Sequence, residues 1–238
     1  MPAWRSPYDR EILVLAVPAL GALIAEPLYL LADTAIVGNL GTRQLGGLAI
    51  AGIVLTAVFG IFNFLAYSTT GAVARHVGAE NLHAAAERGV DGLWLAAGLG
   101  ALLGIAGILL APAIVNVMGA SASVRPYALT YLRISLLGAP FVLVALAGAG
   151  YLRGLQDTKT TLAIAIAANV MNLALELFLV YGLDLGIAGS AWGTVVAQIG
   201  AAAAFLVIAR ITARRAGATL GPSAAGVRET AVVGGHLI

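Results

Sequence analysis

The chain has 238 residues, of which 61% are hydrophobic and only 10% charged, and its mean hydropathy is +0.97. A soluble domain is about one quarter charged, so this composition excludes a water-soluble globular protein and predicts a polytopic membrane protein. The net charge of +2 does not indicate nucleic-acid binding, because the arginines lie at the ends of apolar segments, as in membrane helices. The lack of cysteine excludes disulfides, thiolate catalysis and Cys-ligated metals.

Six apolar segments are long enough to cross the roughly 30 Å of hydrocarbon, which takes about 20 helical residues. The pattern therefore predicts an all-α membrane protein with a six-transmembrane-helix bundle in residues 1–216. In chain order the expected helices span residues 11–37, 45–74, 87–118, 124–152, 160–181 and 187–212.

Residues 217–238 follow a basic segment and become apolar again, but they are too few to span a membrane. We interpret them as a cytoplasmic linker and the truncated start of a seventh helix. Either this tail lies on the membrane surface, or the chain is one half of a longer protein, which is the alternative that we favour.

Basic residues are concentrated on alternate connections between the expected helices. Ten lysines and arginines fall on the side that holds both termini and two, Arg43 and Arg125, on the other. The positive-inside rule then places both termini in the cytoplasm. Arg133 lies within the fourth helix, where it either extends towards the outer surface or pairs with an acid in the bundle.

Small residues recur at helical spacing. The third helix contains Gly100-x3-Gly104, and the sixth spaces small residues four apart from Gly189 to Ala201. Such stripes let membrane helices approach closely, so we interpret them as packing surfaces. Pro140 in the fourth helix predicts a kink there.

Carboxylates interrupt two of the apolar segments. Glu26 and Asp33 are seven residues apart on the first helix, and Asn169, Asn172 and Glu176 share one face of the fifth. An acid in lipid costs about 2.5–3.5 kcal/mol on insertion scales, so such residues usually face a water-filled cavity and mark an ion path. The pattern therefore favours a transport protein.

Neutral polar residues could complete this site. Thr194 and Gln198 form an i, i+4 pair on the sixth helix, and Asn63 lies on the second. Plain interhelical hydrogen bonds are an alternative role for all three. Carboxylates beside amides and hydroxyls can take up a proton or bind Na⁺ as a hard cation, and the sequence leaves that choice open.

Enzyme signatures are absent from the sequence, which has no HExxH, phosphate loop or GxSxG. His76, His83 and His236 lie in loops or in the tail, so an intramembrane hydrolase would lack its base. We therefore expect no enzymatic activity and no cofactor, with an ion gradient of H⁺ or Na⁺ as the source of energy.

Five segments together carry a family resemblance: LADTAIVGNLGTRQLGGLAIA, GAVARHVGAENLHAAAERG, YLRISLLGAP, YLRGLQDTKTTL and GIAGSAWGTVVAQ. In this order they resemble the multidrug and toxic compound extrusion (MATE) family, in particular its bacterial DinF-like branch. The resemblance runs from about residue 11 to residue 215. It implies the N-terminal lobe of a twelve-helix transporter made of two similar six-helix lobes.

The resemblance also implies roles for individual residues. Asp33 matches a coupling aspartate on the first helix, and Asn172 and Glu176 match an Asn-x3-Asp pair on the fifth, with glutamate in place of aspartate. Thr194 matches a threonine near the same cavity, whereas Glu26 matches no family site. A site for Na⁺ would then lie at Asp33 and Glu176.

The expected function is export of amphipathic or cationic organic compounds by cation-coupled antiport across a bacterial cytoplasmic membrane. The expected partners are the lipid bilayer and a second six-helix lobe, with no nucleic acid. Two alternatives remain: a lipid-linked oligosaccharide flippase of the same superfamily, and a truncated membrane remnant or scaffold without transport activity.

Overall fold

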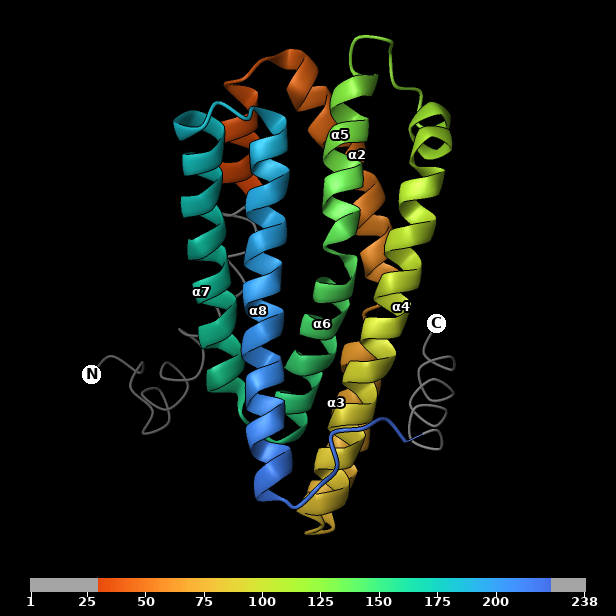
Figure 1. Ribbon diagram of the computed structural model, residues 1–238, viewed down its shortest axis with the longest axis vertical. Helices are drawn as coiled ribbons and strands as arrows, with labels where there is room; N and C mark the ends of the chain where they lie inside the picture. Colours follow the sequence, from red (N-terminus) through yellow and green to blue (C-terminus); the bar gives the residue numbers. More distant parts are fainter. Residues whose placement is uncertain (1–29, 224–238) are drawn as a thin grey trace, which may run out of the picture.

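The computed structural model describes residues 30–223, which are helical apart from short connections (Figure 1). Residues 30–38 form the end of the first expected helix. The following elements are α2 (Thr42–Ile61), α3 (Phe64–Gly78), α4 (Leu82–Val117), α5 (Arg125–Leu137), α6 (Ala139–Gly154), α7 (Thr158–Leu177), a π-helical turn η1 (Phe178–Gly182) and α8 (Ile187–Arg215).

The predicted all-helical membrane bundle is confirmed. Within residues 30–223, four helical stretches are long and apolar enough to cross a membrane, one of them formed by α2 and α3 together, and α5 with α6 make a fifth when they are counted as one span bent by 49°. These five correspond to the expected helices from residue 45 to residue 212. Most of the expected first helix, including Glu26, lies outside the described residues.

Two of the helices that we expected to be continuous are broken. The segment 45–74 divides between α2 and α3 at Phe62 and Asn63, and 124–152 divides at Gly138. At the second break Pro140 has no backbone N–H, so it cannot continue the hydrogen-bond ladder of α5. The kink predicted at Pro140 is thus confirmed, and it is sharp enough to separate two helices.

The glycine stripes are packing surfaces, as predicted. A Cβ added at Gly100 would lie 2.5 Å from the Cα of Pro140, and one at Gly104 would lie 2.8 Å from the carbonyl oxygen of Leu136. α4 therefore packs directly on the backbone of the α5–α6 bend. On α8, a Cβ at Gly189 would lie 2.9 Å from the carbonyl carbon of Leu179, so α8 and η1 meet backbone to backbone.

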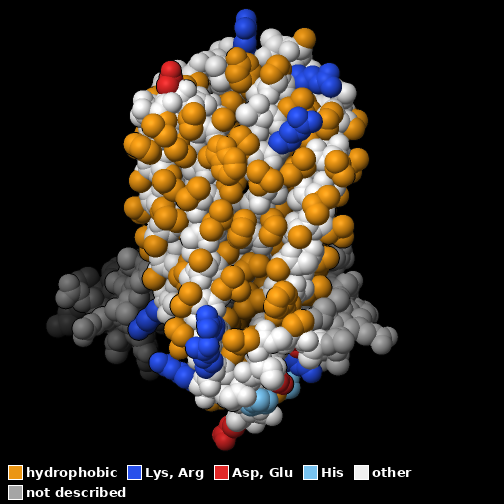
Figure 2. Space-filling model, viewed as in Figure 1, with side chains coloured by type: hydrophobic (Ala, Val, Ile, Leu, Met, Phe, Trp, Pro, Cys, Tyr) orange, Lys and Arg blue, Asp and Glu red, His pale blue; other side chains and the backbone are white. Residues whose placement is uncertain are grey.

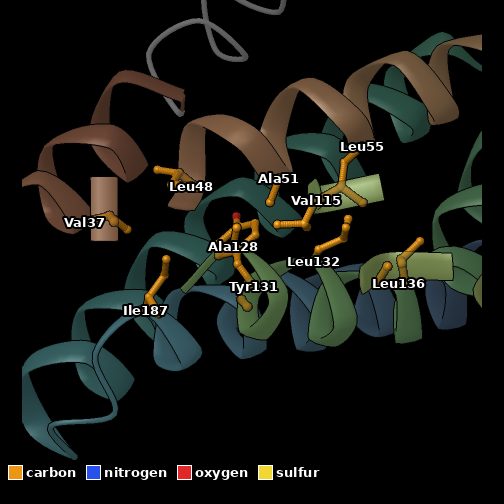
Figure 3. Close-up of a cluster of buried hydrophobic side chains, with 12 residues drawn as sticks. Val37, Leu48, Ala51, Leu55, Val115, Ala128, Tyr131, Leu132, Leu136 and Ile187 are labelled. Carbon is orange, nitrogen blue, oxygen red and sulfur yellow. The ribbon is translucent and has the colours of Figure 1, made fainter. Parts of the chain in front are cut away.

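Apolar side chains fill the interior at the end of the bundle near the 39–41 connection. This cluster joins the 30–38 helix to α2, α4, α5 and α8, and its side chains point towards one another in Figure 3. The members labelled there are Val37, Leu48, Ala51, Leu55, Val115, Ala128, Tyr131, Leu132, Leu136 and Ile187. The cluster fixes the 30–38 helix against α8, which positions Asp33.

The surface has the charge distribution of a membrane-spanning bundle. Figure 2 shows a wide hydrophobic band around the middle of the visible face, with basic side chains towards both ends. Large exposed hydrophobic residues are frequent on the spans, for example Leu109 on α4 and Val170 on α7. Exposed apolar surface of this extent fits a lipid environment and not water.

Candidate functional site

Asp33 is buried where the 30–38 helix meets α8. Its side chain is 5% exposed, and the hydroxyl of Ser190 donates a hydrogen bond of 2.7 Å to its Oδ1. A second contact fixes the same helix, because the hydroxyl of Tyr181 donates to the carbonyl oxygen of Ile36 at 3.1 Å. The carboxyl group of Asp33 thus points into the bundle and not towards lipid.

Glu176 lies in the last turn of α7 and is completely buried. Gly193 makes this burial possible, since a Cβ at that position would lie 3.0 Å from the backbone nitrogen of Glu176. The close approach of α7 and α8 encloses the glutamate side chain between them. Among the described residues, neither carboxyl oxygen of Glu176 has a hydrogen-bond partner of good geometry.

The two acids form an interacting pair. The carboxyl of Glu176 lies close enough to that of Asp33 for direct electrostatic interaction, and the hydroxyl of Ser190 faces both groups. Two ionised carboxylates repel each other strongly when both are out of water. A proton shared between them, or a cation bound to both, would remove that repulsion.

A pocket of about 340 Å³ lies between α6, α7 and α8. It is lined by four of the residues predicted from sequence, Asn169 and Asn172 from α7 and Thr194 and Gln198 from α8. Most of the remaining lining is aliphatic. The pocket thus combines an apolar wall with a few polar groups, which is the usual character of a small-molecule site.

The pocket and the acid pair are neighbours along both helices. Asn172 lies one turn before Glu176 on α7, and Thr194 lies one turn after Ser190 on α8. The hydroxyl of Thr194 donates to the carbonyl oxygen of Ser190 at 3.2 Å, so it lies next to the residue that holds Asp33. A group bound in the pocket would therefore lie beside the acid pair.

Asn63 and Arg133 lie elsewhere. Asn63 is exposed at the break between α2 and α3, and it is not part of the pocket lining. Arg133 is exposed on α5, which fits a side chain that extends outwards and not one paired with an acid inside the bundle. Glu26 lies outside the described residues.

Ser190 and Tyr181 were missed by sequence reasoning. Ser190 is four residues before Thr194 on the same helix face, and that spacing could have identified it. Tyr181 gave no such signal, because a tyrosine near a helix end is common at membrane interfaces.

The acid pair offers oxygen ligands only. The carboxyl oxygens of Asp33 and Glu176 and the hydroxyl of Ser190 are the hard donors that Na⁺ and other hard cations prefer. Within residues 30–223, no group of three or more His, Cys, Asp or Glu side chains could hold a metal ion.

Comparison with known proteins identifies the family. The MatE family model matches residues 18–178. DNA damage-inducible protein F of Escherichia coli (strain K12) is 34% identical, and the match covers 82% of this chain and 43% of that protein. Protein DETOXIFICATION 44, chloroplastic, of Arabidopsis thaliana is 35% identical over 79% of this chain and 38% of its own length.

Solved structures agree with this assignment. The fold matches an outward-facing multidrug resistance MATE family transporter of the MOP superfamily with a TM-score of 0.81 and 26% identity. That match covers 94% of this chain and 50% of the transporter, and the chain spans less than half the length of the curated relatives named above. The chain therefore belongs to the MATE family and corresponds to one lobe of a twelve-helix transporter.

Proposed function

We propose that this chain is the N-terminal half of a cation-coupled antiporter that exports amphipathic organic compounds. The observation that carries the proposal is the buried Asp33–Glu176 pair, with one hydroxyl donor from Ser190 between them. A buried pair of acids that has no basic partner within residues 30–223 is costly for stability, so it is expected to serve a function.

The pair acts as the site of the coupling ion. When empty and ionised, the two carboxylates repel each other; one proton on a carboxyl oxygen converts this contact into a hydrogen bond from one acid to the other. A bound Na⁺ would neutralise the pair in the same way, with oxygens from Asp33, Glu176 and Ser190 as ligands. Either ion changes the local charge by one unit at the end of the pocket.

The pocket supplies the compound-binding part of the proposal. Its aliphatic wall suits the apolar part of an amphipathic compound, while the amides of Asn169 and Asn172 offer hydrogen bonds. A cationic substrate would be attracted by the ionised acid pair and repelled once the pair has bound its ion. Substrate and coupling ion would therefore alternate, which is the requirement for antiport.

A second six-helix lobe is part of the proposal, because matched transporters are about twice as long as this chain. In parallel-repeat transporters, access alternates as one lobe moves against the other. We propose that the complete protein lies in a bacterial cytoplasmic membrane, with both ends of this chain on the cytoplasmic side.

The test is efflux from proteoliposomes that contain the chain together with its second lobe, under an imposed H⁺ or Na⁺ gradient. We expect Asp33→Asn and Glu176→Gln each to reduce gradient-driven efflux at least tenfold. The matched control is Asp184→Asn, because Asp184 is an exposed acid in the connection before α8. Unchanged gradient dependence in both site variants would contradict the proposal.

The flippase alternative gains no support from the pocket. A site for lipid-linked phosphate requires cationic groups, whereas no lysine or arginine lines the described pocket and Arg133 is exposed on α5. Binding of a lipid-linked pyrophosphate to the reconstituted protein, in competition with cationic compounds, would reverse this preference.

A further inference from the structure

One face of α4 near its N-terminus carries four side chains that take no part in the proposed coupling site. They are His83, Glu87, Asp91 and Trp94, and their spacing of four, four and three residues places them in one line along the helix. Asp91 is only 2% exposed although it lies in the third turn of the helix. We call this line the α4 stripe.

The α4 stripe holds the segment that leaves α8, residues 216–223, which crosses the bundle in Figure 1. Each member of the stripe contacts this segment. The contacts are His83 Nδ1 with the carbonyl oxygen of Ala216 at 3.1 Å, the hydroxyl of Thr219 with Glu87 Oε1 at 3.5 Å, Trp94 Nε1–H with the carbonyl oxygen of Leu220 at 3.0 Å, and Ser223 with Asp91.

Asp91 makes the strongest of these contacts. The backbone N–H of Ser223 donates to its Oδ1 at 2.7 Å and the hydroxyl of Ser223 donates to its Oδ2 at 2.9 Å. Arg88 lies 3.5 Å from the same Oδ2. If the segment detached, a nearly buried carboxylate would lose both donors from Ser223, and such a group is expensive to leave unsatisfied.

Apolar contacts also hold residues 216–223 against α4 and α8. Ala86 and Val90 of α4 pack with Ala213 of α8, and Ala216 and Ala218 of the segment cover them. Leu220 closes one side of a groove between α4, α6 and α8. The segment is thus held by side chains on two faces of its path and not only by the polar stripe.

We propose that residues 216–223 form a strap that stays fixed to α4 throughout the working cycle of the protein. The polar contacts are spread along the whole segment, and the most buried one is at its far end. Release of the far end therefore removes both Ser223 donors from Asp91 and leaves Arg88 as its partner, while release of the near end uncovers Ala86 and Val90. It follows that any hinge between this lobe and a second one lies outside residues 216–223. This consequence and the reference to a working cycle rest on the proposed function, whereas the contact of the strap with α4 does not.

Hydrogen exchange tests the strap in the 238-residue chain, without any transport measurement. We expect the Ser223 amide to be protected, and Asp91→Ala to increase its exchange rate about tenfold or more, because a charged acceptor is lost. Ser223→Ala removes only one donor from the surface and leaves the helices untouched, so a smaller increase across residues 219–223 is expected. Free exchange of these amides in the unmodified chain would overturn the proposal.

The control is Glu80→Gln, which neutralises an exposed acid in the connection before α4, outside the α4 stripe. It should leave exchange in residues 216–223 unchanged. An increase equal to that of Asp91→Ala would mean that loss of negative charge at this end of the bundle, and not the contact with Ser223, controls exchange, and this would also overturn the proposal.

A reversible crosslink tests whether the strap stays in place during transport. Glu87 and Thr219 meet through the end of the glutamate side chain, at 3.5 Å, so Glu87→Cys and Thr219→Cys are joined by a short thiol crosslinker with a reducible centre and not by a direct disulfide. The 238 residues hold no other cysteine, and the crosslinked fraction is measured before transport. In the complete transporter, we expect efflux to be the same with the strap crosslinked or released. Loss of efflux on crosslinking that reverses on reduction would show that the strap must detach. If efflux is absent in both states, the proposed function fails, and hydrogen exchange still decides the strap.

Discussion

Ser190 makes the two buried acids inequivalent. Its hydroxyl donates to Asp33 at 2.7 Å, whereas the oxygens of Glu176 have no partner of good geometry among the described residues. A hydrogen bond to a charged acceptor is stronger than one between neutral groups, and this donor is directed at Asp33. We propose that this single side chain on α8 governs how the pair shares a proton or cation.

Replacing Ser190 should therefore weaken binding of Na⁺ to the pair. We expect Ser190→Ala to lower the apparent affinity for Na⁺ about tenfold, because one of the three proposed oxygen ligands is lost. Ion binding can be measured as the increase in thermal stability with ion concentration.

Thr34→Ala is the matched control for this variant. Thr34 follows Asp33 directly, but it is exposed and its hydroxyl donates to the carbonyl oxygen of Leu30 within its own helix. The control should respond to ions as the parent does. A Ser190→Ala protein with the same ion dependence as the parent would contradict the role given to the hydroxyl.

Asp157 outside the membrane provides a pH-dependent contribution to stability. It caps the N-terminus of α7, where its Oδ1 accepts from the backbone N–H of Thr160 at 3.0 Å. Hydrogen bonds from Thr160, helped by the charge of Lys159, lower the pKa of Asp157 below its ordinary value. The lowered pKa means that the stabilisation is complete above the pKa of the unfolded chain, about 3.9, and is lost as the pH falls through the lower folded value.

We expect Asp157→Ala to destabilise the protein by about 1 kcal/mol at pH 7, as is typical for loss of a cap. The difference from the parent should shrink as the pH falls below about 4. Asp157→Asn keeps a capping oxygen that does not titrate, so its stability should lack this loss. Chemical denaturation in detergent between pH 3 and pH 7 measures the free energy of unfolding of the parent and of both variants. A difference between the parent and Asp157→Ala that does not depend on pH would contradict the argument.

At the scale of the helices, the contact between α4 and the α5–α6 bend depends on the lack of a side chain at Gly100. A Cβ there would lie 2.5 Å from the Cα of Pro140 and 2.9 Å from the carbonyl oxygen of Ala139, so backbone must shift. We expect Gly100→Ala to destabilise the bundle by about 1–3 kcal/mol, the usual cost of overpacking. Thermal unfolding in detergent or nanodiscs measures the difference in stability between Gly100→Ala and the parent.

Gly98 offers a control two residues away on the same helix. It is exposed, and a Cβ there would meet nothing within 4 Å. Gly98→Ala should be neutral or stabilising by up to about 1 kcal/mol, because alanine has the higher helix propensity. Equal effects of the two substitutions would show that the close packing at Gly100 is not what limits stability.

The helices themselves were largely predictable from sequence, because long apolar segments fix where spans begin and end to within a few residues. The break between α2 and α3 was not predicted, and at Pro140 the sequence predicted a kink but not a bend sharp enough to separate two helices. That bend arises where Pro140 removes a backbone donor, but α4 carries Pro112 inside a continuous helix. Whether a proline bends or breaks a helix thus depends on its packing partners, which a single sequence does not display.

The acids of the candidate site were predictable because they stand out in the sequence itself, without knowledge of their packing partners. Asp33 and Glu176 are conspicuous because a carboxylate in an apolar span is expensive. A serine in a helix costs little, so Ser190 gave a weak signal. Asp91 was overlooked because it lies near the end of its helix, where an acid is ordinary, and only the fold brings Ser223 to it.

For the whole molecule, the distribution of charge predicts how the lobe is oriented. Among the described residues, seven lysines and arginines gather at the end with the α3–α4 and α6–α7 connections, whereas Arg43, Arg125 and, within α5, Arg133 lie towards the opposite end; the seven are Arg75, Arg88, Arg153, Lys159, Arg210, Arg214 and Arg215. By the positive-inside rule, this asymmetry predicts that the first end faces the cytoplasm.

The cysteine-free sequence allows a direct measurement of this orientation. Ala79, in the α3–α4 connection, and Ala122, between α4 and α5, are both exposed alanines without charge, so replacing either leaves the charge balance unchanged. We expect a membrane-impermeant maleimide to label Ala122→Cys in intact cells and Ala79→Cys only after permeabilisation. The reverse labelling pattern would show that the topology is inverted, because the two connections flank the same helix, α4, and so lie on opposite sides of the membrane. The strap and the end with seven basic residues would then face outwards, which contradicts the positive-inside rule.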